Sequence, residues 1–150
     1  MELRPYKESD LEKILLLFYE TVHSVNAADY NKEQLDAWAP LNPDTEKWGK
    51  TLRYAITYVA TENGTLLGFG SIDKSGFLHY LFVNKNFLRK KTATALCDKL
   101  EKLCPRNIVT HSSITAKPFF EKRGYIVIKE QTVERFGVEL RNYVMEKPAL

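Results

Sequence analysis

Cysteine is scarce in this sequence, and no other cluster of metal ligands takes its place. Only two cysteines occur among 150 residues, Cys97 and Cys104, with no Cys-x-x-Cys pair. Both fall on one expected helix, where seven residues correspond to roughly 10 Å along the axis. That separation is too large for a disulfide. We therefore expect packing residues in a reducing compartment, and no metal site.

Long apolar runs and a strong excess of one charge are also absent. No stretch of about 18 apolar residues occurs, and the first ten residues, MELRPYKESD, do not resemble a signal peptide. The formal net charge is only +3. The one basic cluster, Lys85 and residues 89–91, has no exposed aromatic residues between its charges. We expect a cytoplasmic protein that binds neither membranes nor nucleic acid.

What the sequence does contain is the material of an ordinary folded domain. Hydrophobic residues make up 44% of the chain and charged residues 27%, which matches usual globular composition. A length of 150 residues predicts one domain, spanning residues 1–150. No repeat, linker or low-complexity segment divides it.

The first third of the chain is mainly helical. Ser9 and Glu12 have the spacing of a capping box, which predicts Ser9 as the N-cap of the first helix. Asn31 and Asp44 are suitable caps for two shorter helices, and the prolines at 40 and 43 separate these helices. The expected elements are a strand at 3–6 and helices at 10–23, 31–38 and 45–53.

From residue 55 onward, strands dominate the pattern. Asn63-Gly64 between two apolar runs is a strong hairpin signal. A helix between two apolar strands then predicts a parallel crossover. The expected elements are strands at 56–60, 66–72 and 77–83, a helix at 92–104, a strand at 107–111, a short helix capped by Thr115 and ended by Gly124, and strands at 125–132 and 138–147.

The resulting order, β-α-α-β-β-β-α-β-α-β-β with two or three helices after the first strand, resembles the GNAT superfamily of acyl-CoA-dependent N-acetyltransferases. Three stretches carry the resemblance: LFVN at 81–84, FLRKKTATAL at 87–96 and AKPFFEKRGY at 116–125. The third is similar to the superfamily pattern A-x-x-F-Y-E-x-x-G-F. The resemblance implies an α/β (α+β) fold with a mixed, mainly antiparallel sheet flanked by helices. It also implies transfer of an acetyl group from acetyl-CoA.

The resemblance assigns most of the cofactor-binding residues. The strand at 77–83 is expected to bind the pantetheine arm, and the loop and helix start after it the pyrophosphate, because helix N-termini attract anions. Lys91 stands where the family has glycine, and Leu88 where it has a polar residue. The alternative is a solvated basic loop. The implied set is Leu81, Phe82, Val83, Leu88, Arg89, Lys90, Lys91, Thr92, Ala93, Thr94, Ser113, Lys117, Phe119 and Phe120.

Amine acetylation needs a base near neutral pKa and a donor for the oxyanion. His79 is the candidate base, with a hydrogen-bonded structural histidine as the alternative reading. Strand alternation predicts that His79 shares a face with Phe77 and Leu81. The family resemblance implies the backbone N–H groups of residues 82 and 83 as oxyanion donors. Phe120 replaces a tyrosine acid of many relatives, so the acid is expected to be Tyr125, Tyr143 or water.

The acceptor is expected to be a small molecule with a primary amine. Tyr19, His23 and Trp38 are the candidate substrate-binding residues, by analogy with the acceptor pocket of this fold. Trp38 and Trp48 are alternatively core anchors, and a charged His23 would also stabilise the end of its helix. The competing function is a catalytically degenerate acyl-CoA-binding or regulatory protein. The expected state is a monomer or homodimer.

Overall fold

The computed structural model describes residues 1–149. The strands are β1 (Glu2–Pro5), β2 (Ile56–Glu62), β3 (Thr65–Ile72), β4 (Phe77–Val83), β5 (Ile108–Ser113), β6 (Ile126–Arg135) and β7 (Val138–Lys147). The α-helices are α1 (Leu11–Ser24), α2 (Lys32–Trp38), α3 (Thr45–Tyr54), α4 (Thr92–Leu103) and α5 (Lys117–Lys122). The predicted order of elements is confirmed, with three α-helices between β1 and β2.

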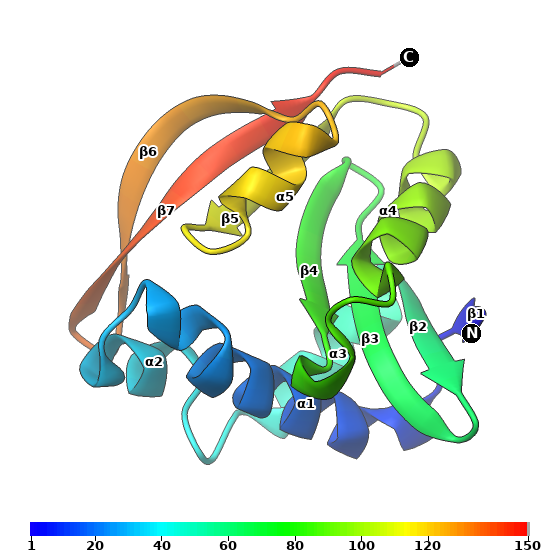
Figure 1. The fold of residues 1–150 in the computed structure, drawn as a ribbon, viewed down its shortest axis with the longest axis horizontal. Coiled ribbons are helices and arrows are strands. Elements are labelled where there is room, and N and C mark those ends of the chain that lie inside the picture. The colour runs from blue at the N-terminus through cyan, green and yellow to red at the C-terminus, as the bar shows by residue number, and fades with distance from the viewer. Residues whose placement is uncertain (150) are drawn as a thin grey trace.

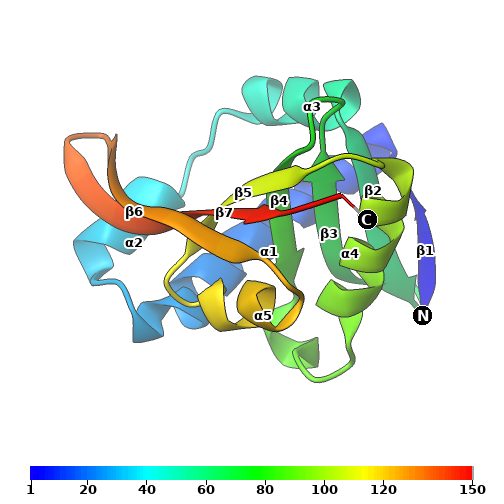
Figure 2. The ribbon, with the colours of Figure 1, turned by 90° about the horizontal axis from the view of Figure 1, so that it is seen from above.

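The seven strands form one sheet in the order β1-β2-β3-β4-β5-β7-β6. Every pairing is antiparallel except that of β4 with β5, which confirms the predicted mixed sheet. Helices α1, α2 and α3 pack on one face of the sheet, and α4 and α5 on the other (Figures 1 and 2). The β6–β7 hairpin curves away from β4 (Figure 1).

Each face of the sheet has its own apolar core. Ile14, Phe18 and Leu52 of the helices on one side meet Phe69 of β3. On the other side, the α4 side chains, with both cysteines, pack against β4, β5 and β7. Burial raises the pKa of the Cys97 thiol to about 12, as expected for a packing residue. Neither cysteine forms a disulfide.

Helix caps follow the predictions at two positions and contradict them at two others. Asn31 and Asp44 accept the N3 amide protons of α2 and α3. The prediction for Ser9 is wrong, because Asp10 accepts the backbone N–H of Lys7 and a bidentate pair from Arg4 instead. These bonds set the entry to α1 from β1.

The predicted cap at the start of α5 is also wrong. The Thr115 hydroxyl donates to Asp29 at 2.8 Å, so it leaves the helix end. Ser113 accepts the backbone N–H of Ala116 at 3.0 Å in its place. The end of β5 and the start of α5 are thereby joined by one side chain.

Residues 1–149 contain neither a membrane-spanning helix nor a cluster of metal ligands. No helix in this range is long and apolar enough to span a membrane. The same range contains no group of three histidine, cysteine or carboxylate side chains placed to hold a metal ion.

Candidate active site

The central feature of the sheet is a gap between β4 and β5. The two strands pair only at Phe77 with Val109 and Leu78 with Thr110. Beyond Leu78 the edge of β4 that faces β5 has no strand partner. The Asn84 N–H donates to Leu67 of β3, and antiparallel donors alternate in direction. The N–H groups of Leu81 and Val83 therefore point into the gap.

This alternation corrects the predicted oxyanion donors. The N–H of Phe82 points toward β3, because Phe82 lies two residues before Asn84 and pairs with Phe69. The Val83 carbonyl points away from β3 and accepts the Thr21 hydroxyl at 2.9 Å. Val83 thus remains a candidate donor, joined by Leu81 rather than by Phe82.

His79 lies at a β-bulge beside the gap. Ser71 of β3 is opposite Tyr80 and Ile72 is opposite Leu78, so His79 is the extra residue. A bulge redirects the side chains around it. The predicted common face is confirmed for Phe77 and His79, whose ring centroids lie 4.7 Å apart beside one cavity. It is wrong for Leu81, which enters the α4 core with Leu78 although the two are three residues apart. The His79 side chain is 30% exposed and borders two cavities.

Asp73 binds and orients the His79 ring. Its Oδ2 lies 2.8 Å from His79 Nε2, while its Oδ1 accepts the backbone N–H groups of Ser75 and Phe77. Burial alone would raise the pKa of Asp73, but the hydrogen bonds from Ser75, His79 and Phe77 lower it to about 2. An ionised Asp73 favours the tautomer with a proton on Nε2. That tautomer leaves Nδ1 of His79 as a proton acceptor.

The first cavity beside His79 occupies the gap itself and is called the gap cavity. Its volume is about 210 Å³. It brings together six of the predicted cofactor-binding residues, which are Leu81, Phe82, Val83, Leu88, Ser113 and Phe120. Thr110 and Ser112 line the side formed by β5. The walls are largely apolar, and the open edge of β4 supplies the unpaired peptide groups.

The second cavity lies between the β6–β7 hairpin and helices α1 and α2, and is called the hairpin cavity. Its volume is about 390 Å³. The wall is rich in aromatic side chains, including Phe18, Tyr30, Trp38 and Tyr80. The two cavities adjoin, because five residues line both: Trp38, His79, Phe82, His111 and Ser113. His79 therefore stands where a molecule in one cavity would meet a molecule in the other.

The basic loop lies between β4 and α4. Lys91 has a left-handed backbone with φ of 58°, the conformation that favours glycine. Lys90 pairs with Glu62 at 2.7 Å. Thr92 is 1% exposed, and its hydroxyl has no hydrogen-bond partner among residues 1–149. The first N–H groups of α4, from Thr92 through Thr94 with Ala93 between, lack intrahelical acceptors.

Several predicted residues lie outside the two cavities. The Tyr125 hydroxyl donates to Glu101 at 2.9 Å, 3% of Tyr125 is exposed, and burial raises its pKa. This placement contradicts the predicted role of Tyr125 as acid. Lys117 pairs with Glu121 at 3.7 Å, and Phe119 packs against the α4 core. Arg89 is exposed in the loop.

Of the three predicted acceptor-binding residues, one lines the cavities and two do not. Trp38 lines both cavities, whereas Tyr19 and His23 line neither. The rings of Tyr19 and His23 lie against each other at a tilt of 32°, with centroids 4.2 Å apart. His23 Nε2 lies 2.8 Å from the Ala39 carbonyl, which holds the chain after α2. His23 therefore anchors the chain after α2 and does not line a cavity.

Three residues of this region were missed by the sequence analysis: Asp73, Arg135 and Asn142. Asp73 falls between the expected strands at 66–72 and 77–83, and an aspartate six residues before a candidate base is a usable signal. Arg135 and Asn142 come from the last hairpin, and nothing in their local sequence distinguishes them. Only the curvature of the hairpin brings them to the wall of the hairpin cavity.

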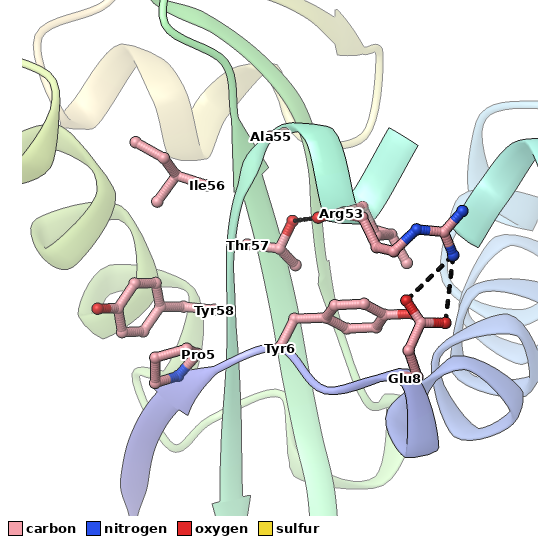
Figure 3. Close-up of a pocket in the computed structure, with 9 residues that line it drawn as sticks. Pro5, Tyr6, Glu8, Arg53, Ala55, Ile56, Thr57 and Tyr58 are labelled. Atoms are coloured by element: carbon pink, nitrogen blue, oxygen red, sulfur yellow. Dashed lines mark hydrogen bonds and ion pairs between the residues drawn. The ribbon is translucent and has the colours of Figure 1, made fainter. Parts of the chain in front are cut away.

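A third cavity, of about 460 Å³, lies between β1, β2 and α3 (Figure 3). The Arg53 guanidinium and the Glu8 carboxylate are paired there at 3.0 Å, and the Tyr6 ring lies alongside them (Figure 3). It shares no lining residue with the two cavities at His79. Its charged groups satisfy each other, so we do not place the active site there.

Comparisons with known proteins agree with this geometry. A family model described as acetyltransferase (GNAT) domain matches residues 26–147. The chain is 31% identical over 145 residues to the uncharacterized N-acetyltransferase YafP of Escherichia coli strain K12, covering 97% of this chain and 94% of that protein.

Solved structures show the same likeness. A GCN5-related N-acetyltransferase from Rhodopseudomonas palustris superimposes with a TM-score of 0.94 at 32% identity, covering 98% of this chain and 94% of that one. The PaiA N-acetyltransferase from Thermoplasma acidophilum, in complex with coenzyme A, gives a TM-score of 0.79 at 19% identity, covering 98% of each chain. On the family match and the two relatives above 30% identity, this chain belongs to the GNAT family of acetyltransferases.

Proposed function

We propose that the protein transfers the acetyl group of acetyl-CoA directly to the primary amine of a small acceptor, with His79 as the base. The observation that supports this most strongly is the position of His79 between the gap cavity and the hairpin cavity. The donor would occupy the first and the acceptor the second. The bound coenzyme A of the Thermoplasma relative supports the choice of donor.

The residues of the gap are suited to acetyl-CoA. Pantetheine carries amide groups, and the free N–H groups of Leu81 and Val83 can bind such groups as another strand would. The pyrophosphate is anionic, and the N-terminus of α4 with Lys91 next to it offers unpaired N–H groups and positive charge. The buried Thr92 hydroxyl, which has no partner among residues 1–149, adds a further donor.

The chemistry requires one proton acceptor and one oxyanion donor. The amine nitrogen attacks the thioester carbonyl carbon, so a C–N bond forms and the C–S bond breaks. Nδ1 of His79 accepts the amine proton while Asp73 holds the ring through Nε2. The N–H of Leu81 or Val83 would stabilise the oxyanion. Phe120 carries no acidic proton, Tyr125 is bound to Glu101, and Tyr143 lines neither cavity, so the leaving thiolate takes its proton from water.

The first test is replacement of the base. His79→Gln should lower kcat/KM for acetyl transfer by roughly 100- to 10,000-fold. The affinity for acetyl-CoA, measured by calorimetry, should change little, because no donor contact is assigned to the ring. His23→Gln is the matched control, since His23 lines neither cavity. Unchanged turnover of His79→Gln at every pH would remove His79 from this role.

The second candidate function is acyl-CoA binding without transfer. Lys91 in a glycine conformation and Phe120 in place of a tyrosine are the observations that favour it. Tight binding of acetyl-CoA without release of coenzyme A thiol across a broad set of primary amines would support it over the enzyme.

A further inference from the structure

The two faces of the β6–β7 hairpin carry opposite charges. Side chains alternate between faces along a strand. One face of β6 presents Lys129, Gln131, Val133 and Arg135, and its opposite face presents Glu130 and Glu134. Val133, Arg135, Leu140 and Asn142 line the hairpin cavity, so the basic face is the inner one.

The acidic charges lie on the outer face. Glu130 pairs there with the Arg141 guanidinium at 3.1 Å, and Glu139 lies opposite Glu134. Arg141 also borders the cavity, but its side chain is committed to Glu130 and its carbonyl accepts the Tyr30 hydroxyl. No carboxylate is among the lining residues of the hairpin cavity, all of which fall within the described chain.

Arg135 is the arginine of this wall that forms no ion pair with a carboxylate among residues 1–149. Within residues 1–149 the one hydrogen bond of its guanidinium is a 3.4 Å contact to the carbonyl of Glu134. Its charge reaches the floor of the cavity. Burial raises the pKa of Tyr80, and Arg135 opposes that rise. Burial lowers the pKa of His111, and Lys129 and Arg135 lower it further.

Asn142 adds an unsatisfied polar group to the same wall. Its Oδ1 is buried and has no hydrogen-bond partner among the described residues. Buried amide oxygens are normally bonded. A bound molecule with an N–H group would satisfy it. Much of the remaining wall is aromatic, with Phe18, Trp38 and Tyr80 among its residues, which suits an apolar or aromatic body.

We propose that the acceptor is an amine that also carries an anionic oxygen group, a carboxylate or a phosphate, on an apolar or aromatic body. Arg135 binds the anion, because its planar fork matches either group. Asn142 accepts an N–H of the same molecule. The inference rests on the proposed function for the identity of the cavity as the acceptor site. It argues against polyamines, since extra cations would meet Arg135 and no carboxylate.

The test compares probes that differ only in the anion. With coenzyme A present, binding is followed by fluorescence in the Trp48→Phe variant, whose remaining tryptophan is the cavity residue Trp38. L-Phenylalanine is compared with phenethylamine for the carboxylate, and O-phosphotyramine with tyramine for the phosphate. At least one anionic probe should bind roughly 10-fold or more tightly than its neutral-bodied counterpart. Spermidine should bind more weakly than either anionic probe, L-phenylalanine or O-phosphotyramine.

Arg135→Gln should remove this preference, whereas the matched Arg53→Gln, which lies in the unrelated third cavity, should keep it. Equal binding of the paired probes, tighter binding of spermidine, or a preference that survives Arg135→Gln would overturn the inference. Acetyl transfer is measured separately with the same probes. Transfer without any anion preference would reject the inference alone, and an anion preference in binding without transfer to any amine would reject the proposed function alone.

Discussion

At the scale of single residues, Asp73 determines how the candidate base is presented. It closes a turn through the backbone of Ser75 and Phe77 and binds His79 with its other oxygen. One carboxylate therefore joins the β3–β4 turn to the ring that borders both cavities. Its side chain is 18% exposed, so these bonds are largely shielded from solvent.

Asp73→Asn should destabilise the protein in a pH-dependent way. The folded pKa of about 2 lies below the ordinary 3.8, a difference that corresponds to about 2 kcal/mol. Because the pKa is lowered by folding, this stabilisation is complete above about pH 5 and is lost as the pH falls through 2. Urea unfolding of both proteins at pH 7 and near pH 2 measures it. A stability difference that is the same at both pH values would contradict the assignment.

At the scale of elements, the junction of β4 and β5 depends on one glycine. Gly76 precedes β4 with φ of 95°, and its carbonyl accepts the Val109 N–H at 2.9 Å. A Cβ at this position would collide with the backbone carbonyl of Asn107. The short parallel pairing that leaves the rest of β4 open begins at this close approach.

Gly76→Ala should therefore cost about 2 to 4 kcal/mol, from the left-handed backbone and the collision together. Gly64→Ala is the matched control: its φ is 79°, but nothing lies within 4 Å of the added methyl group. It should cost about 1 kcal/mol from the backbone alone. Chemical denaturation of both variants gives the comparison, and equal losses would mean that the approach to Asn107 is not tight.

The sequence predicted elements more reliably than it predicted contacts. Periodicity and caps located the helices and strands, and Asn31 and Asp44 cap as expected because an N-cap depends on local chain geometry. The Ser9 prediction failed locally, because the neighbouring Asp10 takes the contacts with Arg4 and Lys7 at the start of α1. The Thr115 prediction failed because the distant Asp29 takes its hydroxyl.

The site was predictable only where it follows the strand order. Leu81 and Val83 were located from the family pattern, and the structure places both beside the gap. The bulge at His79 depends on the register with Ser71 and Ile72, which a single sequence does not reveal. The position of Tyr125 depends in the same way on the distant Glu101, which holds its hydroxyl outside the two cavities.

At the scale of the whole molecule, Glu101 of α4 ties the helix to the last hairpin. It binds Arg123 after α5 and Lys147 of β7, each at 2.8 Å, and accepts the hydroxyl of Tyr125. The side chain is only 16% exposed. Burial would raise its pKa, but hydrogen bonds from these three groups lower it. The cluster connects the two sides of the sheet that part at the gap.

Glu101→Gln should destabilise the protein by roughly 3 kcal/mol, because Lys147 loses its anion and the largely buried Arg123 keeps only the exposed Asp98. Asp98→Asn is the matched control: Asp98 also binds Arg123, at 2.9 Å, but is 59% exposed. Its loss should cost less than about 1 kcal/mol. Thermal and urea unfolding would measure both, and a small effect at Glu101 would show that the cluster is well solvated.

The open edge of β4 has a consequence for how this protein can change. The groups that it exposes at Leu81 and Val83 are peptide N–H groups, which every amino acid except proline supplies. Substitutions there can alter the shape of the gap while its hydrogen-bond donors persist. The hairpin cavity, by contrast, is defined by side chains such as Arg135 and Trp38. The hydrogen-bond donors of the gap cavity therefore persist through most substitutions. The lining of the hairpin cavity changes with each side chain that is replaced.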